Sequence, residues 1–205
     1  MFINRKICYN SSIRYVSGLW GLGGHGIVFA GRLLGMAAAM GGLDSILTIT
    51  YSPPEQRGGG WSRADVIIAK EMVDYPLIDE ADLFLATTQQ AFNLEFKSLR
   101  KGGVFIYEST IYKPTIPNLG SYVVIPVPAT EIAEKTTGRK LTMNVVLVGI
   151  ITAILEPVIK EDHIINAIKG MTRRAGKLDT SVQEMNIKAF QAGLDYGKKY
   201  LQELR

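Results

Sequence analysis

The residues of this 205-residue chain with the clearest chemical potential are Gly21, Gly23 and Gly26, which are spaced as G-x-G-x-x-G. A strand-like segment precedes them and a helix-like segment, 27–40, follows. Glycines in that setting allow a tight turn and let the backbone approach a ligand closely. The amino terminus of the helix then offers free N–H groups and a partial positive charge to a phosphate or carboxylate. The pattern therefore predicts an anion-binding turn and supplies no group that breaks a bond.

A dinucleotide dehydrogenase would add an acidic residue about 20 residues later, at the end of the second strand, to bind the ribose hydroxyls. The second predicted strand, 45–51, ends in Tyr51, with Asp44 before it and Glu55 in the loop after it. This departure weakens the case for bound NAD. The alternative that the glycines only let helix and strand pack closely stays open.

A second glycine-rich segment, 52–60, follows that strand at the edge of the sheet where α/β proteins bind ligands. Its Arg57 offers a planar, two-pronged contact to a phosphate or carboxylate. The neighbouring Gly58 and Gly59 would admit a ligand or another subunit close to the backbone. A solvated surface turn is the alternative interpretation.

His25 stands at the predicted amino terminus of helix 27–40, where a positive charge would oppose the helix dipole. We therefore expect a neutral donor or a packing residue and no catalytic base, and no Asp or Cys partner for it is evident in the sequence. Nothing assembles a nucleophile, a base and an oxyanion hole. With Cys8 as the single cysteine, the chain lacks a ligand set for an iron–sulfur cluster or a structural zinc. We predict no catalytic and no metal-binding residue.

Composition and periodicity predict the fold class. The chain is 47% hydrophobic and 20% charged, which is typical of a globular protein. Strand-like and helix-like segments alternate from residue 14, and this pattern predicts an α/β fold with a Rossmann-like, mostly parallel sheet covered by helices. We expect a single domain, with an amino-terminal extension 1–13, a sheet core 14–128 and a helical part 129–205 packed on it.

The expected elements are as follows. Strands are predicted over 13–20, 45–51, 65–69, 81–87, 104–108 and 122–127. Helices are predicted over 27–40, 89–99, 130–136, 144–155, 161–168 and 181–204. Asn144 is expected to cap the helix that follows it, and the pair Gly102-Gly103 to end the helix before it.

Charge and hydropathy exclude two classes of partner. The net charge of +4 includes a basic group at 169–177 that is too short to indicate nucleic acid. The longest apolar run, 145–155, falls short of the roughly 20 residues that span a bilayer. We expect a cytoplasmic protein that binds neither nucleic acid nor membrane.

Three blocks of sequence occur in a specific order and spacing: GLGGHGIVFAGRLL (21–34), PEQRGG (54–59), and MNVVLVG (143–149) with EMNIKAFQAG (184–193). Together they resemble the gamma subunit of the 2-oxoacid:ferredoxin oxidoreductases, the family that acts on pyruvate, 2-oxoglutarate and 2-ketoisovalerate. His25 stands where the family usually has Gln, and Pro53 where it has Gly. The second block looks closer to the 2-oxoglutarate and branched-chain types than to the pyruvate type.

The resemblance implies a hetero-oligomeric enzyme of anaerobic metabolism that converts a 2-oxoacid and coenzyme A to acyl-CoA and carbon dioxide and passes electrons to ferredoxin. Thiamine diphosphate, magnesium and iron–sulfur clusters would belong to the partner alpha and beta subunits, and to a delta subunit where one is present. This chain would contribute assembly and coenzyme A binding and would be inactive alone. The candidate cofactor-binding residues are Gly21, Gly23, Gly24, His25, Gly26, Glu55, Arg57, Gly58 and Gly59. A stand-alone nucleotide-binding protein and a non-enzymatic scaffold are the alternatives.

Overall fold

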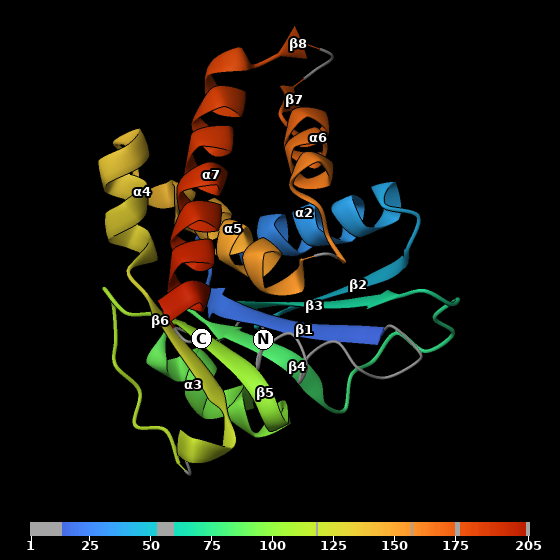
Figure 1. Ribbon diagram of the computed structural model, residues 1–205, viewed down its shortest axis with the longest axis vertical. Helices are drawn as coiled ribbons and strands as arrows, with labels where there is room; N and C mark the ends of the chain where they lie inside the picture. The colour runs from blue at the N-terminus through green and yellow to red at the C-terminus, as the bar shows by residue number, and fades with distance from the viewer. Residues whose placement is uncertain (1–13, 53–59, 118, 157, 175–176, 204–205) are drawn as a thin grey trace.

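The computed structural model describes residues 14–52, 60–117, 119–156, 158–174 and 177–203 (Figure 1). Six strands form one mixed sheet in the order β2-β3-β1-β4-β5-β6. The strands are β1 (Arg14–Leu22), β2 (Asp44–Tyr51), β3 (Trp61–Ala69), β4 (Ala81–Ala86), β5 (Leu99–Glu108) and β6 (Val123–Val127). Strands β1, β4, β5 and β6 pair in parallel, and β3 runs antiparallel between β2 and β1. The predicted α/β fold with a mostly parallel sheet is confirmed.

Helices cover both faces of the sheet. The helices are α2 (Ile27–Met40), α3 (Gln89–Glu95), α4 (Ala129–Thr137), α5 (Met143–Leu155), α6 (Glu161–Met171) and α7 (Thr180–Glu203). Short 3₁₀ turns occupy Phe96–Ser98, Leu119–Ser121 and Lys140–Thr142, and a two-stranded ribbon joins β7 (Arg173–Arg174) to β8 (Lys177–Leu178). Figure 1 shows α2, α5, α6 and α7 above the sheet and α3 below it. In the described part of the chain no helix is both long and apolar enough to cross a membrane.

Two cores follow from the alternation of side chains along the strands. On β1, Leu19 points into the large core beneath α2 and α5, and Trp20 points into an aromatic core on the opposite face. The aromatic core continues through Phe84, Phe92 and Phe105. The large core draws residues from both the sheet and the carboxyl-terminal helices. That the chain forms a single domain stays a prediction. It is supported by this core, to which both the sheet and the carboxyl-terminal helices contribute.

Helices α5 and α7 pack in direct backbone contact because glycines lie between them. A Cβ on Gly193 of α7 would collide with the backbone of Val146, and one on Gly149 of α5 would collide with the backbone around Phe190. All thirteen residues of α5 are buried as a result. The glycines of the third sequence block, 143–149 with 184–193, are therefore explained by packing, because they set the distance between the two helices.

Several element boundaries differ from the predictions. Strand β3 begins at Trp61, four residues before the predicted start, because Trp61 pairs with β1, and Ser62 and Arg63 pair with both β1 and β2. Strand β5 begins at Leu99 and passes through Gly102 and Gly103, which do not end a helix. Strand β1 continues to Leu22 and so includes Gly21. In each case pairing with a neighbouring strand overrides the local glycine or polar signal.

We expect Gly193→Ala to lower the free energy of unfolding by about 1–3 kcal/mol, because the added methyl group overpacks the contact with α5. The matched control is Gly170→Ala on α6, where the nearest atom to a new Cβ is the end of the Met36 side chain at 3.7 Å. That change should be neutral or stabilise by up to about 1 kcal/mol. Urea denaturation followed by circular dichroism compares the two, and equal losses would contradict the packing account.

Candidate functional site

The glycine turn spans Gly23–Gly26, between the carboxyl end of β1 and the first residue of α2. Gly24 and Gly26 have φ angles of 92° and 71°, in the left-handed region that favours glycine. The Gly23 N–H donates to the Gly60 carbonyl, and a Cβ on Gly23 would lie 2.9 Å from that oxygen. The turn therefore needs glycine for its conformation at two positions and for close approach at a third.

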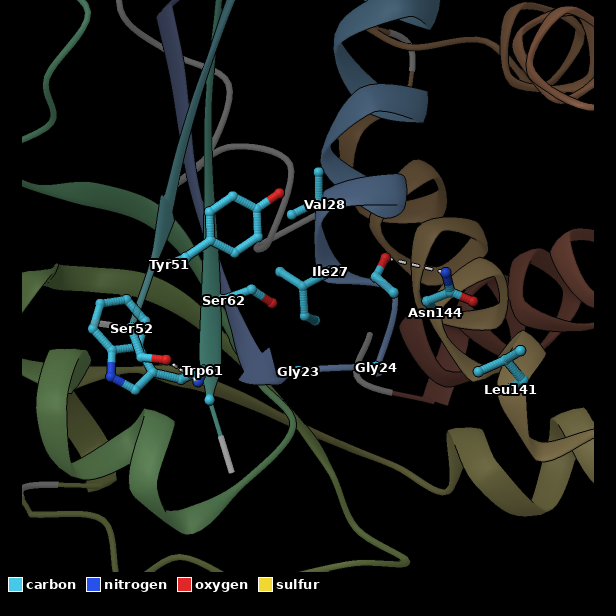
Figure 2. Close-up of a pocket in the computed structure, with 12 residues that line it drawn as sticks. Gly23, Gly24, Ile27, Val28, Tyr51, Ser52, Trp61, Ser62, Leu141 and Asn144 are labelled. Atoms are coloured by element: carbon cyan, nitrogen blue, oxygen red, sulfur yellow. Dashed lines mark hydrogen bonds between the residues drawn. The ribbon is translucent and has the colours of Figure 1, made fainter. Parts of the chain in front are cut away.

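A pocket of about 620 Å³ opens beside this turn, a volume within the range of small-molecule sites. Figure 2 shows its three sides: the ends of β2 and β3, the glycine turn with the start of α2, and the start of α5. The lining residues are Gly23, Gly24, Gly26, Ile27, Val28, Tyr51, Ser52, Gly60, Trp61, Ser62, Leu141 and Asn144. None of them carries a charge, so the electrostatics of this lining come from backbone dipoles and a few hydroxyl and amide groups.

The amino terminus of α2 supplies the strongest of these dipoles. Its N-cap is Gly26, which has no side chain to accept a hydrogen bond, and its first turn contains no acidic residue. The first N–H groups of the helix therefore have no capping side chain. Because Ile27 and Val28 line the pocket, these groups lie beside it and attract a negatively charged group.

Asn144, which is distant from the turn in the sequence, holds the turn in place. Its Nδ2 donates to the Gly26 carbonyl at 3.1 Å (Figure 2), and a Cβ on Gly26 would collide with the Asn144 side chain. The expectation that Asn144 caps its own helix is wrong, because α5 begins at Met143 with Thr142 as its N-cap. The residue holds the amino terminus of α2 instead, and a separation of 118 residues hid this role from sequence reasoning.

His25 is not among the residues that line the pocket. Its Nδ1 lies 2.8 Å from the Thr87 hydroxyl, directly after β4. Burial lowers the pKa of His25 below its ordinary value of 6.5, and the nearby Glu108 carboxylate opposes that effect. The neutral form expected from the sequence is therefore favoured at pH 7. The sequence showed no Asp or Cys partner for His25, and the carboxylate that acts on the ring in the structure is Glu108, at the end of β5.

Glu108 itself ties three segments together and is fully buried. Its carboxylate accepts hydrogen bonds from the N–H groups of Thr110, Ile111 and Thr130, at 3.3, 2.7 and 3.1 Å. Thr130 lies in the first turn of α4, where a carboxylate also complements the helix dipole. Glu108 thus holds α4 against the edge of the sheet that carries the glycine turn.

The sequence pattern of the pyruvate ferredoxin/flavodoxin oxidoreductase family matches residues 18–196. The chain belongs to this family. The 2-oxoglutarate synthase subunit KorC of Methanothermobacter marburgensis is 33% identical over 181 residues, which cover 84% of this chain and 91% of that protein. The resemblance predicted from the three sequence blocks is confirmed, and with it the interpretation of the chain as a subunit of a 2-oxoacid:ferredoxin oxidoreductase.

Two solved structures of this family share the fold. The gamma subunit of the keto/oxoacid ferredoxin oxidoreductase from Geobacter sulfurreducens PCA is 28% identical, with a TM-score of 0.73 over 89% of this chain and 98% of that chain. The 2-oxoglutarate:ferredoxin oxidoreductase from Magnetococcus marinus, solved with 2-oxoglutarate, coenzyme A and succinyl-CoA bound, is 21% identical. Its TM-score is 0.75 over 91% of this chain and 31% of that chain, a likeness that shows the fold alone.

The nine predicted site residues do not all lie together in the structure. Gly23, Gly24 and Gly26 line the pocket, whereas His25 contacts Thr87 outside its lining. Gly21 belongs to β1, where a Cβ would collide with Thr87 and Ile27, so close packing explains this glycine. The other four predicted site residues, Glu55, Arg57, Gly58 and Gly59, lie outside the described residues.

Ser52 and Gly60, the two ends of the segment predicted as a binding edge, line the pocket. Sequence reasoning missed the other pocket residues outside the turn and α2, namely Tyr51, Trp61, Ser62, Leu141 and Asn144. The position of Tyr51 at the end of a strand was a usable signal, because ligands bind beyond the carboxyl ends of strands. No comparable signal marked Trp61 or Leu141.

We expect Gly26→Ala to lower the free energy of unfolding more than Gly24→Ala does. Both changes force alanine into the left-handed region, at a cost of about 1–2 kcal/mol. Only Gly26→Ala also collides with Asn144, whereas a Cβ on Gly24 has open space around it. Denaturation of both variants, and of Gly26→Ala combined with Asn144→Ala, measures the difference. An equal loss for the two single variants would show that the Asn144 contact is unimportant.

The half-buried ring of His25 predicts a pH dependence of stability. Its folded-state pKa lies below the unfolded value, so the unfolded chain binds the proton more readily and stability falls as the pH drops through about 6.5. The variant His25→Gln cannot bind that proton, and we expect it to lose less stability than the parent between pH 7.5 and pH 5. Thermal unfolding across this pH range tests the sign, and parallel profiles would refute it.

Proposed function

We propose that this subunit binds coenzyme A in the pocket beside its glycine turn. The observation that carries the proposal is the amino terminus of α2, which has no capping side chain among the described residues and lies beside a pocket of about 620 Å³ whose described lining carries no charge. Helix amino termini of this kind bind phosphate groups, and coenzyme A carries both a pyrophosphate and a ribose phosphate. The Magnetococcus marinus enzyme has coenzyme A bound, which supports the choice of ligand.

The complex would catalyse oxidative decarboxylation of a 2-oxoacid. The oxoacid anion and the coenzyme A thiol give acyl-CoA, carbon dioxide, one proton and two electrons, and ferredoxin takes the electrons. Thiamine diphosphate, magnesium and iron–sulfur clusters in the alpha and beta subunits, and in a delta subunit where one is present, supply the carbon–carbon bond cleavage and the electron transfer. Among the described residues no group of three or more histidine, cysteine, aspartate or glutamate side chains is placed to hold a metal ion.

The residues of this chain bind and orient the co-substrate. The backbone N–H groups at the start of α2 hold phosphate oxygens, and Asn144 fixes these groups by its hydrogen bond to Gly26. Ile27, Val28 and Leu141 form apolar walls that exclude water from the bound portion. No step of bond breaking is assigned to these side chains, and we expect the isolated chain to be inactive.

The substrate we favour is 2-oxoglutarate. The support is the relationship to the KorC subunit of 2-oxoglutarate synthase, together with the PEQRGG block at 54–59. A cytoplasmic location stays a prediction of the sequence.

A charge placed in the first turn of α2 tests the coenzyme A site. We expect Val28→Glu to raise the KM for coenzyme A about tenfold in the assembled complex. The carboxylate repels phosphate and also offsets the partial positive charge at the amino terminus of the helix. The matched control, Val28→Gln, has nearly the same shape without the charge. The KM for the 2-oxoacid should be the same in both variants. Equal KM values for coenzyme A in the two variants would favour a purely structural role for the subunit.

A further inference from the structure

The Tyr51 ring is an exposed aromatic surface inside the candidate site. Tyr51 is the last residue of β2, it is 63% exposed, and it lines the pocket. Its side chain extends toward Val28 on the first turn of α2 (Figure 2). Among the described residues no other aromatic ring stacks on it. An aromatic face of this size left open to the pocket is available to a flat ligand group.

The scaffold that carries Tyr51 is fixed at the end of the β2–β3 pair. The Ser52 N–H donates to the Trp61 carbonyl at 2.9 Å, and the Trp61 N–H donates to the Ser52 hydroxyl at 3.1 Å. The Trp61 ring stacks on Trp20, with 5.0 Å between ring centroids and 19° between planes. These contacts hold the backbone next to Tyr51, so the residue that carries the ring has a defined position at the end of β2.

Two parts of a nucleotide site recur here, a helix amino terminus after the first strand and the end of the second strand, but β3 lies between β1 and β2 and sets the second strand one position farther from the turn. In α/β proteins that bind nucleotides, phosphates lie at the amino terminus of the first helix and the ribose lies over the end of the second strand. Here the end of the second strand carries Tyr51 in place of the acidic residue of the dinucleotide-binding pattern. A base that continues beyond the ribose then meets an aromatic ring. Stacking on such a ring is a common way to hold a base because every base has a flat face.

We propose that Tyr51 is the stacking platform for a purine base, so that the pocket takes the adenosine end of coenzyme A. This proposal rests on the proposed function. The pantetheine arm, which is flexible and has no aromatic part, would extend out of the pocket and carry its thiol toward a partner subunit. That orientation fits a subunit to which no bond-breaking group is assigned.

Coenzyme A could enter the pocket with its adenosine end or with its pantetheine end, and fragments of the molecule distinguish these two orientations. Adenosine 3′,5′-bisphosphate and 4′-phosphopantetheine both carry phosphate, so the dipole of α2 alone does not distinguish them. We expect the bisphosphate to bind the full chain in a calorimetric titration and to compete with coenzyme A, and the phosphopantetheine to bind at least tenfold more weakly. Because the chain has two tryptophans, Trp20 and Trp61, the fluorescence change of a Trp20→Phe variant reports binding next to Trp61.

Three variants define the part played by the ring. Tyr51→Leu should weaken binding of the bisphosphate and of coenzyme A about tenfold, because it removes the stacking surface. Tyr51→Phe should retain the affinity of the parent chain. Tyr75→Leu is the matched control, since Tyr75 is 53% exposed and lies outside the pocket lining. Each of these side chains is exposed, so folding is expected to be unaffected.

The outcomes distinguish this proposal from the one on which it rests. Competition by phosphopantetheine alone, or an unchanged affinity of Tyr51→Leu for coenzyme A, would overturn the stacking role while leaving coenzyme A binding in place. A chain and an assembled complex in which neither fragment binds, and in which Val28→Glu leaves the KM for coenzyme A unchanged, would overturn both.

Discussion

The close backbone contacts of the glycine turn constrain the rest of the site. Over the four residues after β1, the Gly23 N–H donates to the Gly60 carbonyl, and Gly24 and Gly26 adopt left-handed conformations. The Gly26 carbonyl then accepts a hydrogen bond from the Asn144 amide. Any side chain at Gly23 or Gly26 would push one of these neighbours away. The position of the amino terminus of α2 is therefore determined by contacts with Gly60 and Asn144, two residues that are distant in the sequence. Its position beside the pocket is a consequence of that geometry.

The antiparallel strand β3 determines what else reaches this edge of the sheet. Because β3 runs against β1 and β2, its first residues lie beside the last residues of both. Trp61 and Ser62 are thus brought to the pocket together with Tyr51. A sheet with β3 in the parallel direction would have placed Trp61 at the opposite edge. The single reversed strand is what gives the pocket its aromatic rim.

Sequence reasoning succeeded where local signals agree with tertiary structure. The range 27–40 of α2 follows from a helical apolar pattern between Gly26 and Gly41, and the structure has the same limits. It failed where strand pairing determines the structure. The predicted strand began at residue 65, but β1 pairs with Trp61, and β1 and β2 both pair with Ser62 and Arg63, so β3 begins earlier. The turn glycines were identified from their spacing. Asn144 was not, because only the folded chain brings α5 to that turn.

The measurement that tests the central claim most directly is an electron cryomicroscopy structure of the assembled complex with coenzyme A. The account predicts phosphate density within hydrogen-bond distance, about 3 Å, of the N–H groups of Ile27 and Val28. Coenzyme A bound elsewhere in the complex, with this pocket filled by a side chain of another subunit, would contradict it and assign the glycine turn to assembly alone.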